Sequence, residues 1–186
     1  MPPKTRKIAV MGFRAVGKSS LVIRFVEDQF VDSYHPSIEN TFEKRVKYSG
    51  QDFLIQLVDT AGQDEYSLFS EAHCVDVHGY VLVYSINSQK SFEVIKVIHD
   101  KILDTMGVSS RSRVPLVLVG NKTDLHMQRV ISTEEGKRLA DSWNAIFVES
   151  SAKQNERVKD IFLMILMEVE KQYEGGGETK QDCSIL

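Results

Sequence analysis

One segment near the N-terminus combines glycines, a lysine and a hydroxyl at a spacing that suits phosphate binding. Residues Gly12 to Ser19 read Gly-Phe-Arg-Ala-Val-Gly-Lys-Ser and match the pattern G-x-x-x-x-G-K-[ST] directly after an apolar run. Glycines permit a backbone path that turns several N–H groups toward a phosphate, and the positive end of the following helix adds to the attraction. Lys18 would reach the β- and γ-phosphates of a nucleotide, and the Ser19 hydroxyl would ligate Mg²⁺. The alternative is a chance glycine-rich turn.

Three further polar motifs follow apolar runs later in the chain. Asp59 opens the motif Asp-Thr-Ala-Gly-Gln at residues 59–63 and can hold Mg²⁺ directly or through water. Asn-Lys-Thr-Asp occupies residues 121–124, and Ser-Ser-Ala-Lys occupies residues 150–153. Open α/β folds bind ligands outside the carboxyl ends of their parallel strands. Four motifs in this order therefore predict one nucleotide site, against the alternative of separate solvated loops.

The base of the nucleotide is indicated by Asp124. A carboxylate only accepts hydrogen bonds, and guanine offers it two adjacent donors, the ring N–H and the exocyclic amine. Adenine has an acceptor at the matching ring nitrogen, so it would leave the carboxylate unpaired at a cost of about 1–3 kcal/mol or more. The sequence therefore predicts a guanine nucleotide.

The elements that must position these motifs alternate along the chain. Short apolar runs between segments of helical period predict an α/β domain with a six-stranded, mostly parallel sheet, one antiparallel strand and about five flanking helices. Strands are expected at residues 7–11, 42–49, 53–59, 80–85, 116–120 and 146–149. The second and third are joined at residues 49–52, which is short enough for a hairpin. Helices are expected after Lys18, Glu65, Ser88, Ser132 and Glu156.

Two of the expected helices carry a further signal. Ser132 and Glu135 form a capping-box pattern, in which each side chain satisfies a free backbone donor of the other residue. Residues 158–169 are unusually apolar, which favours a helix packed on the sheet over a helix with a partner-binding stripe.

Composition excludes several classes of protein. The chain has 186 residues, of which 42% are hydrophobic, and this length suits one domain. Its formal net charge of -3 provides no basic surface for nucleic acid, which is therefore not expected as a partner. Cys74 and Cys183 are far apart, so neither a disulfide framework nor a zinc site is expected. No apolar stretch is long enough for a signal peptide or a membrane span.

Together the motifs resemble the Ras superfamily of small GTPases over about residues 6–173, and within it the Rheb family most closely. The resemblance to Rheb rests on residues 34–42, 59–67 and 91–99, and on Arg14, where typical Ras proteins carry glycine. It implies a GTPase domain at residues 1–173 that binds GTP and GDP with Mg²⁺, hydrolyses GTP slowly and is a monomer.

The resemblance also assigns roles to individual residues. Gln63 would position the attacking water, Phe30 would stack on the guanine, and the Gly62 N–H would bind the γ-phosphate. The catalytic set it implies is Arg14, Lys18, Tyr34 and Gln63. The Mg²⁺ ligands it implies are Ser19, Ser37 and Asp59. The nucleotide-binding set is Ala15, Val16, Gly17, Lys18, Ser19, Ser20, Phe30, Val31, Asp32, Tyr34, Ser37, Gly62, Asn121, Lys122, Asp124, Ser151, Ala152 and Lys153.

Two segments would be switches that order only when the γ-phosphate is present. Residues 31–42 would be switch I and the effector surface, and residues 62–75 would be switch II. Ser37 stands where most Ras and Rheb sequences have threonine, so the hydroxyl ligand is kept but the methyl that stiffens χ1 is lost. His35 replaces a common aspartate and removes a negative charge from the effector surface.

The last residues differ in character from the domain. Residues 174–186 are expected to form a flexible tail, because Glu-Gly-Gly-Gly-Glu at residues 174–178 cannot bury a core. The final Cys183-Ser-Ile-Leu186 matches a prenylation signal whose terminal leucine typically directs geranylgeranyl. A prenyltransferase would therefore be a partner, and Cys183 would anchor the protein at the cytoplasmic face of endomembranes, lysosomal, ER or Golgi, with a cytosolic pool.

The function expected from these features is a molecular switch. The Rheb resemblance implies the TOR kinase complex as effector and the tuberous sclerosis complex as the GTPase-activating protein. One rival function is a constitutively GTP-bound adaptor, because Arg14 crowds the space near the γ-phosphate. Another is an ATP-dependent P-loop kinase, which Asp124 opposes and for which the sequence contains no acceptor-binding lid.

Overall fold

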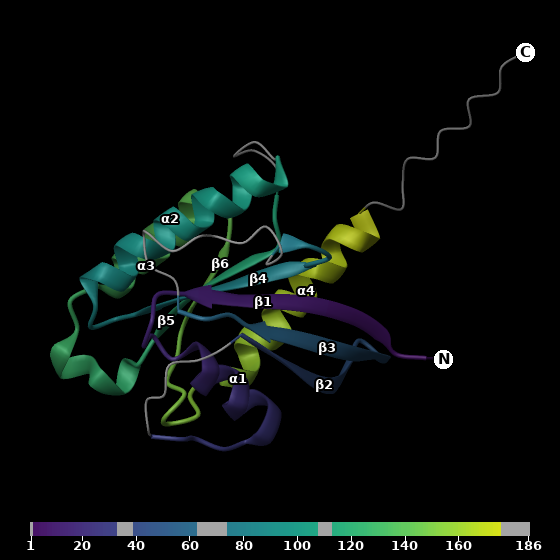
Figure 1. Ribbon diagram of the computed structural model, residues 1–186, viewed down its shortest axis with the longest axis horizontal. Coiled ribbons are helices and arrows are strands. Elements are labelled where there is room, and N and C mark those ends of the chain that lie inside the picture. Colours follow the sequence, from purple (N-terminus) through teal and green to yellow (C-terminus); the bar gives the residue numbers. More distant parts are fainter. Residues whose placement is uncertain (1, 33–38, 63–73, 108–112, 176–186) are drawn as a thin grey trace, which may run out of the picture.

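The structure, a computed structural model, describes residues 2–32, 39–62, 74–107 and 113–175. Its strands are β1 (Lys4–Gly12), β2 (Asn40–Tyr48), β3 (Gln51–Asp59), β4 (Gly79–Ser85), β5 (Leu116–Asn121) and β6 (Ile146–Glu149). They form one six-stranded sheet in the order β2-β3-β1-β4-β5-β6 (Figure 1). Only the β2–β3 pair is antiparallel among the strand pairs of the described residues. The predicted fold class is confirmed.

The antiparallel pair is the predicted hairpin, with a tighter turn than its sequence suggested. Tyr48 pairs with Gln51, so the turn consists of Ser49 and Gly50 alone. Both turn residues have positive φ, 48° and 77°, which matches the right-handed twist of the flanking strands.

The first strand begins three residues earlier than predicted. Lys4 already pairs with Phe53 of β3, so pairing rather than hydrophobicity sets this boundary. Side chains at this end of β1 are exposed or half-buried, and Ile8 to Gly12 are buried. A polar strand end of this kind carries no apolar signal in the sequence.

The helices of the described residues are α1 (Lys18–Glu27), α2 (Gln89–Met106), the 3-10 helix η2 (Thr123–Gln128), α3 (Thr133–Ser142) and α4 (Val158–Gly175). The helix expected after Glu65 lies outside the described residues. The capping box of α3 has both halves: the Glu135 N–H donates to Ser132 Oγ at 3.1 Å, and the Ser132 N–H donates to Glu135 Oε2 at 2.9 Å. Within the described part of the chain, no helix is long and apolar enough to cross a bilayer.

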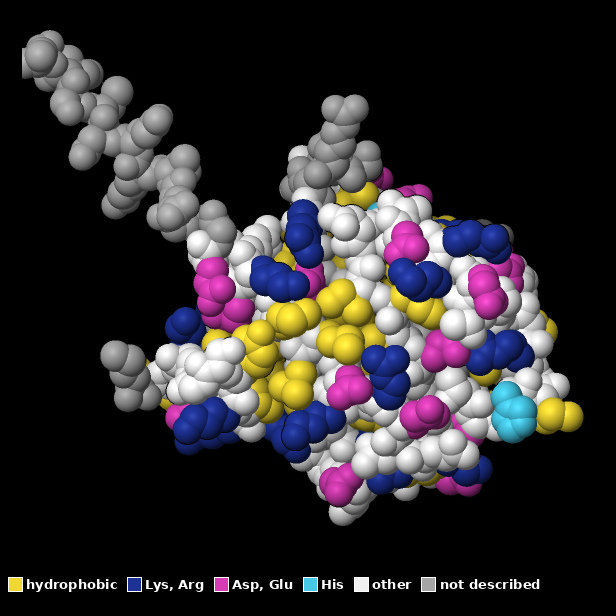
Figure 2. Space-filling model, turned by 180° about the vertical axis from the view of Figure 1, so that it is seen from behind, with side chains coloured by type: hydrophobic (Ala, Val, Ile, Leu, Met, Phe, Trp, Pro, Cys, Tyr) yellow, Lys and Arg dark blue, Asp and Glu magenta, His cyan; other side chains and the backbone are white. Residues whose placement is uncertain are grey.

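Two apolar layers fill the space between the sheet and its helices. Helices α1 and α4 cover one face of the sheet, and α2 and α3 cover the other (Figure 1). Their apolar side chains pack against these two faces. The apolar residues of α4 are buried in the first layer, among them Ile161, Phe162 and Ile165, as predicted for a helix on the sheet. Basic and acidic side chains are interspersed over the face shown in Figure 2, with apolar side chains gathered near its middle.

Candidate functional site

The sequence motifs meet at one edge of the sheet, where β1, β3, β5 and β6 end. The loop from Gly12 to Gly17 connects β1 to α1, and Asn121 is the last residue of β5. Gly17 has φ 99°, and a Cβ on it would lie 2.3 Å from Asn121 Nδ2. Only glycine therefore fits where the phosphate loop passes the base motif.

Two hydrogen bonds join the base motif to the phosphate loop. Asn121 Nδ2 donates to the Val16 carbonyl at 2.9 Å in a buried contact, and Lys122 Nζ donates to the Ala15 carbonyl at 2.6 Å. Ala15 holds a left-handed conformation with φ 60°, which is unfavourable for alanine unless its surroundings fix it. The two motifs thus form one rigid unit although about a hundred residues separate them.

Lys18 is a buried cation at the start of α1. Its side chain is 5% exposed, and Nζ donates to the carbonyls of Gly12 at 3.1 Å and Phe13 at 2.9 Å. Burial lowers the pKa of Lys18 to about 8, although the Asp59 carboxylate acts to raise it. A nearby phosphate would favour the charged form of this side chain.

Asp59 and Ser19 form an oxygen-rich pair beside Lys18. Ser19 Oγ donates to Asp59 Oδ2 at 2.5 Å. The other carboxylate oxygen, Oδ1, is buried with no hydrogen-bond partner in the described part of the chain, and burial raises the pKa of this carboxyl. An unpaired carboxylate oxygen and a hydroxyl are ligands that suit Mg²⁺. No group of three or more acidic, histidine or cysteine side chains that could hold a metal ion occurs in the described residues. The expected ligand Ser37, nucleotide phosphates and water would have to complete such a site.

Asp124 is held by the next motif along the sheet edge. Ser151 Oγ donates to Asp124 Oδ1 at 2.6 Å, and Ser150 Oγ donates to Asn121 Oδ1 at 3.2 Å. Both serines are fully buried, and Ala152 is 4% exposed. The loop after β6 therefore fixes the side chains of Asn121 and Asp124 in the base motif.

Gly62 lies against Arg14 of the phosphate loop. A Cβ built on Gly62 would lie 2.6 Å from Arg14 Cα, so the two backbones are in close contact. The Arg14 side chain is exposed, with Cζ 5.4 Å from the centroid of the Phe13 ring. The start of the predicted switch II thus touches the residue that distinguishes this loop from that of typical Ras proteins.

The remaining predicted residues divide into two groups. Those that the structure describes lie on α1, on the segment after it, or on the loop after β6: Ser20, Phe30, Val31, Asp32 and Lys153. Those that lie outside the described residues are Tyr34, Ser37, Gln63 and Cys183.

Three supporting residues were not predicted for the site. Thr60 is fully buried, and its Oγ1 donates to the Val10 carbonyl at 2.9 Å, which fixes the chain directly after Asp59. Thr123 Oγ1 donates to Glu156 Oε2 at 3.0 Å, and Arg24 Nε donates to the Ala152 carbonyl at 3.0 Å. Thr60 and Thr123 stand inside recognisable motifs, whereas nothing in the sequence around Arg24 signals its contact.

The comparisons with known proteins agree with this geometry. The profile of the Ras family matches residues 7–171. The chain belongs to the Ras family. It is 58% identical to human GTP-binding protein Rheb over 183 residues, 98% of each chain, and 59% identical to the GTP-binding protein Rheb homolog of Drosophila melanogaster over 185 residues, 100% of each chain. It is 54% identical to GTP-binding protein rhb1 of Schizosaccharomyces pombe over 171 residues, 92% of this chain and 91% of that one.

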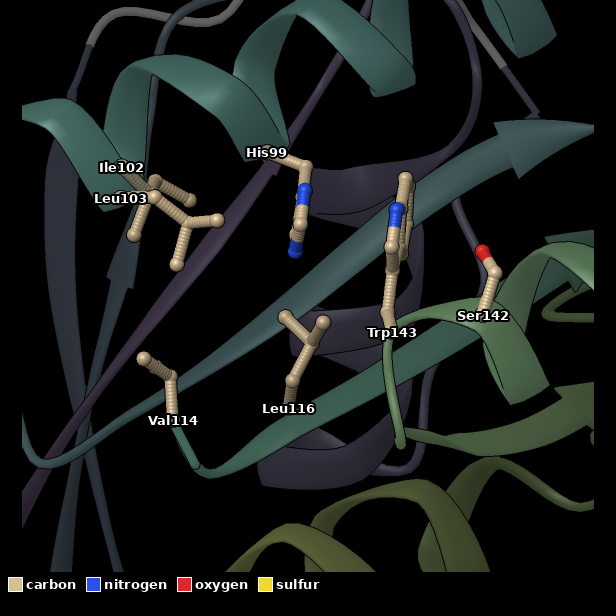
Figure 3. Close-up of a pocket in the computed structure, with 7 residues that line it drawn as sticks. All are labelled: His99, Ile102, Leu103, Val114, Leu116, Ser142 and Trp143. Carbon is tan, nitrogen blue, oxygen red and sulfur yellow. The ribbon is translucent and has the colours of Figure 1, made fainter. Parts of the chain in front are cut away.

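A pocket in this Ras-family domain lies away from the motifs, between α2, the start of β5 and the end of α3. Figure 3 shows its lining residues: His99, Ile102, Leu103, Val114, Leu116, Ser142 and Trp143. The His99 and Trp143 rings are stacked, with centroids 4.0 Å apart and planes 8° apart. Burial lowers the pKa of His99, so its ring is a neutral, mainly apolar wall near pH 7. The pocket contains none of the residues predicted for nucleotide binding.

Proposed function

We propose that this protein is a molecular switch that binds GTP and GDP with Mg²⁺ and hydrolyses GTP slowly. Membership of the Ras family makes the chain a small GTPase, and its Rheb relatives are named as GTP-binding proteins. The observation that carries the proposal is the pair of hydrogen bonds from Asn121 and Lys122 to the carbonyls of Val16 and Ala15. They place the guanine motif and the phosphate loop at a fixed separation, as one nucleotide requires.

The residues of the site would divide the chemistry among them. Lys18 and the N–H groups of the loop would bind the phosphates, and Asp124 would accept hydrogen bonds from guanine. Ser19, Asp59 and Ser37 would hold Mg²⁺, which when bound neutralises charge on the phosphate oxygens. Gln63 and Tyr34 would orient the attacking water. This catalysis consists of positioning and charge stabilisation, with no covalent step on the protein.

The proposal extends to partners and location. Residues 1–173 would form the GTPase domain, and residues 31–42 would bind an effector, the TOR kinase complex by analogy with Rheb. The tuberous sclerosis complex would accelerate hydrolysis. Residues 174–186 would form a tail that a prenyltransferase modifies at Cys183, and the lipid would hold the protein on the cytoplasmic face of lysosomal, ER or Golgi membranes, with a cytosolic pool.

Two measurements test the core of the proposal. Nucleotide extracted after gentle purification should be GDP or GTP, and ATP or ADP in its place would favour the kinase alternative. Single-turnover hydrolysis of bound GTP with Mg²⁺ should be slow but measurable, and faster with a cognate activating domain. A protein that retains GTP with no turnover in either condition would be the adaptor instead.

A further inference from the structure

Arg24 connects two segments that are far apart in the sequence, the segment after α1 and the loop after β6, and each of them contains residues predicted for nucleotide binding. It is in the last turn of α1, and its guanidinium donates through all three nitrogens. Nε donates to the Ala152 carbonyl at 3.0 Å, and Nη2 donates to the Lys153 carbonyl at 3.1 Å. Nη1 donates to the carbonyl of Asp28, the C-cap of α1, at 3.3 Å.

The same guanidinium lies near the aromatic residue that follows α1. Arg24 Cζ is 5.9 Å from the centroid of the Phe30 ring, and Phe30 is partly buried against the core. A second contact joins the same two segments, since Asn155 Nδ2 donates to Asp28 Oδ1 at 3.4 Å. The loop after β6 and the segment after α1 are therefore tied together through Arg24.

We propose that Arg24 is a positioning residue that slows nucleotide release by holding two walls of the base site at a fixed separation. This inference rests on the proposed function and on the roles that the Ras resemblance implies, in which Phe30 would stack on guanine and Ala152 would bind the nucleotide. The Arg24 guanidinium does not touch the nucleotide and acts through these walls. Both walls are loop segments, and loops move more readily than the strands and helices that they connect. Without Arg24, the Phe30 segment separates from the loop after β6 more often, and the base leaves faster.

A lysine cannot replace the contacts of the Arg24 guanidinium. A planar guanidinium binds two neighbouring carbonyls and a third acceptor at once, whereas a lysine ammonium is a point charge on a flexible stem. Arg24→Lys therefore keeps the charge and loses the bridge. Because the bridge lies at the base end of the site, its loss affects GDP and GTP alike and leaves the γ-phosphate chemistry unchanged.

The test is the dissociation rate of a fluorescent GDP and of a fluorescent non-hydrolysable GTP analogue, each chased with excess GDP in Mg²⁺. Arg24→Gln should accelerate both about tenfold, since hydrogen bonds to a charged group are among the stronger ones in proteins but this side chain is half-exposed. Arg24→Lys should also release both nucleotides faster than wild type, and nearly as fast as Arg24→Gln. Arg157→Gln is the matched control. It removes an arginine near the same loop, and the Nε of this arginine pairs with Asp160 at 3.4 Å. This substitution should leave both dissociation rates unchanged.

Single-turnover hydrolysis of pre-bound GTP separates positioning from general destabilisation. We expect its rate to stay within about twofold of wild type in both Arg24 variants, because a tenfold change would require about 1.4 kcal/mol at the reaction centre. The inference is overturned if Arg24→Gln releases GDP at the rate of Arg157→Gln, or if Arg24→Lys restores the wild-type rate. If Arg24→Gln does not fold, Arg24→Lys decides by the same criteria. Wild-type protein that binds no guanine nucleotide would refute the proposed function itself, which is a separate outcome.

Discussion

The Asp124 carboxylate has one oxygen engaged within the protein. Ser151 Oγ donates to Oδ1 at 2.6 Å, which orients the group and leaves its other acceptor sites for a ligand. We predict that Asp124→Asn, which adds a donor and removes the charge, weakens GTP binding and favours xanthosine nucleotides, whose base has an acceptor where guanine has the exocyclic amine. A competition assay with GTP and XTP measures the change in preference.

The control for this experiment is Asp160→Asn, which removes an exposed carboxylate that pairs with Arg157. It should leave the preference for GTP unchanged. Equal preference for GTP over XTP in wild type and Asp124→Asn would remove the basis for assigning guanine to this residue.

Arg14 gives the second prediction at this scale. Its backbone contacts Gly62, the residue expected to bind the γ-phosphate. We therefore expect the bulk of its side chain to disturb the geometry of the attacking water. We predict that Arg14→Gly accelerates intrinsic single-turnover hydrolysis. Arg14→Lys keeps the length and charge and should hydrolyse GTP at about the wild-type rate. Agreement of the Arg14→Gly and wild-type rates within error would show that Arg14 does not slow the reaction.

Residues inside a recognisable motif were predictable, and a supporting residue outside the motifs was not. The pattern around Lys18 and the order of motifs lead to Asp59, Asn121 and Ser151, which the structure brings to one edge of the sheet. Arg24 has no such pattern, because two of its three partners are backbone carbonyls 128 and 129 residues away. Contacts of this kind depend on the tertiary fold and not on local sequence.

At the scale of elements, helix propensity and packing have opposite effects when Gly136 in α3 is replaced by alanine. Alanine is favoured over glycine in a helix by about 1 kcal/mol, but a Cβ here would lie 2.3 Å from Tyr84 Oη and 2.5 Å from Phe147 Cζ. Overpacking a core costs about 1–3 kcal/mol. We predict that Gly136→Ala lowers the free energy of unfolding by about 1 kcal/mol. Urea unfolding monitored by circular dichroism measures this change.

Tyr84→Phe is the matched background for that substitution. The Tyr84 hydroxyl is buried with no hydrogen-bond partner among the described residues, so removal of this hydroxyl should be neutral or stabilising by up to about 1 kcal/mol. It also removes the closest atom to the new methyl group. Gly136→Ala should therefore cost less in Tyr84→Phe than in wild type, and equal costs in both backgrounds would assign the effect to another contact.

A second element-scale prediction concerns the junction of β1 and β4. His78 Nδ1 accepts the Lys7 N–H at 2.9 Å, so this nitrogen is unprotonated in the folded protein. Burial lowers the pKa of His78, and the positive charge of Arg6 lowers it further. The negative charges of Asp76 and Glu170 act to raise it. Below pH about 6.5 the unfolded chain binds more protons at this residue than the folded one. The stability that His78 contributes is therefore complete above that pH and lost as the pH falls through the folded pKa.

The measurement is the melting temperature at pH 7.5 and 5.5. We expect a smaller loss in His78→Asn than in wild type, because asparagine keeps an acceptor for the Lys7 N–H without titrating. His99, whose pKa is also lowered by burial, remains in both proteins and contributes equally to both. Identical losses in the two proteins would show that His78 does not titrate differently on folding.

The sequence predicted the existence of the described strands and α-helices better than their ends, and it did not predict the 3-10 helix η2. Period and turn signals located all six strands, but the start of β1 at Lys4 depends on pairing with β3, for which polar side chains give no sign. The capping box at Ser132 gave the start of α3 correctly, because that signal is local chemistry. Boundaries are predictable where side chains near in sequence set them, and not where a neighbouring strand does.

At the scale of the whole molecule, the charges of the proposed tail bear on membrane binding. Glu174, Glu178 and Asp182 outnumber Lys180 in residues 174–186, so the tail has no basic cluster. Each basic residue near an anionic leaflet would contribute about 1 kcal/mol, and this tail has no surplus of them. Burial of a prenyl chain contributes about 0.8 kcal/mol per CH₂, yet stable anchoring usually takes a second signal. We therefore predict reversible membrane attachment that depends on Cys183 and is nearly independent of salt.

Sedimentation of the prenylated protein with liposomes containing anionic lipid, over a series of salt concentrations, measures this dependence. Cys183→Ser should abolish binding and leave nucleotide affinity unchanged, because residues 176–182 lie between the end of α4 and the cysteine. Ser184→Ala is the control, since it keeps the cysteine and the terminal Ile185-Leu186 that a prenyltransferase would recognise. A steep loss of binding with salt, or membrane binding by Cys183→Ser, would reveal a second anchor, which would have to be a charged or apolar surface of the domain itself.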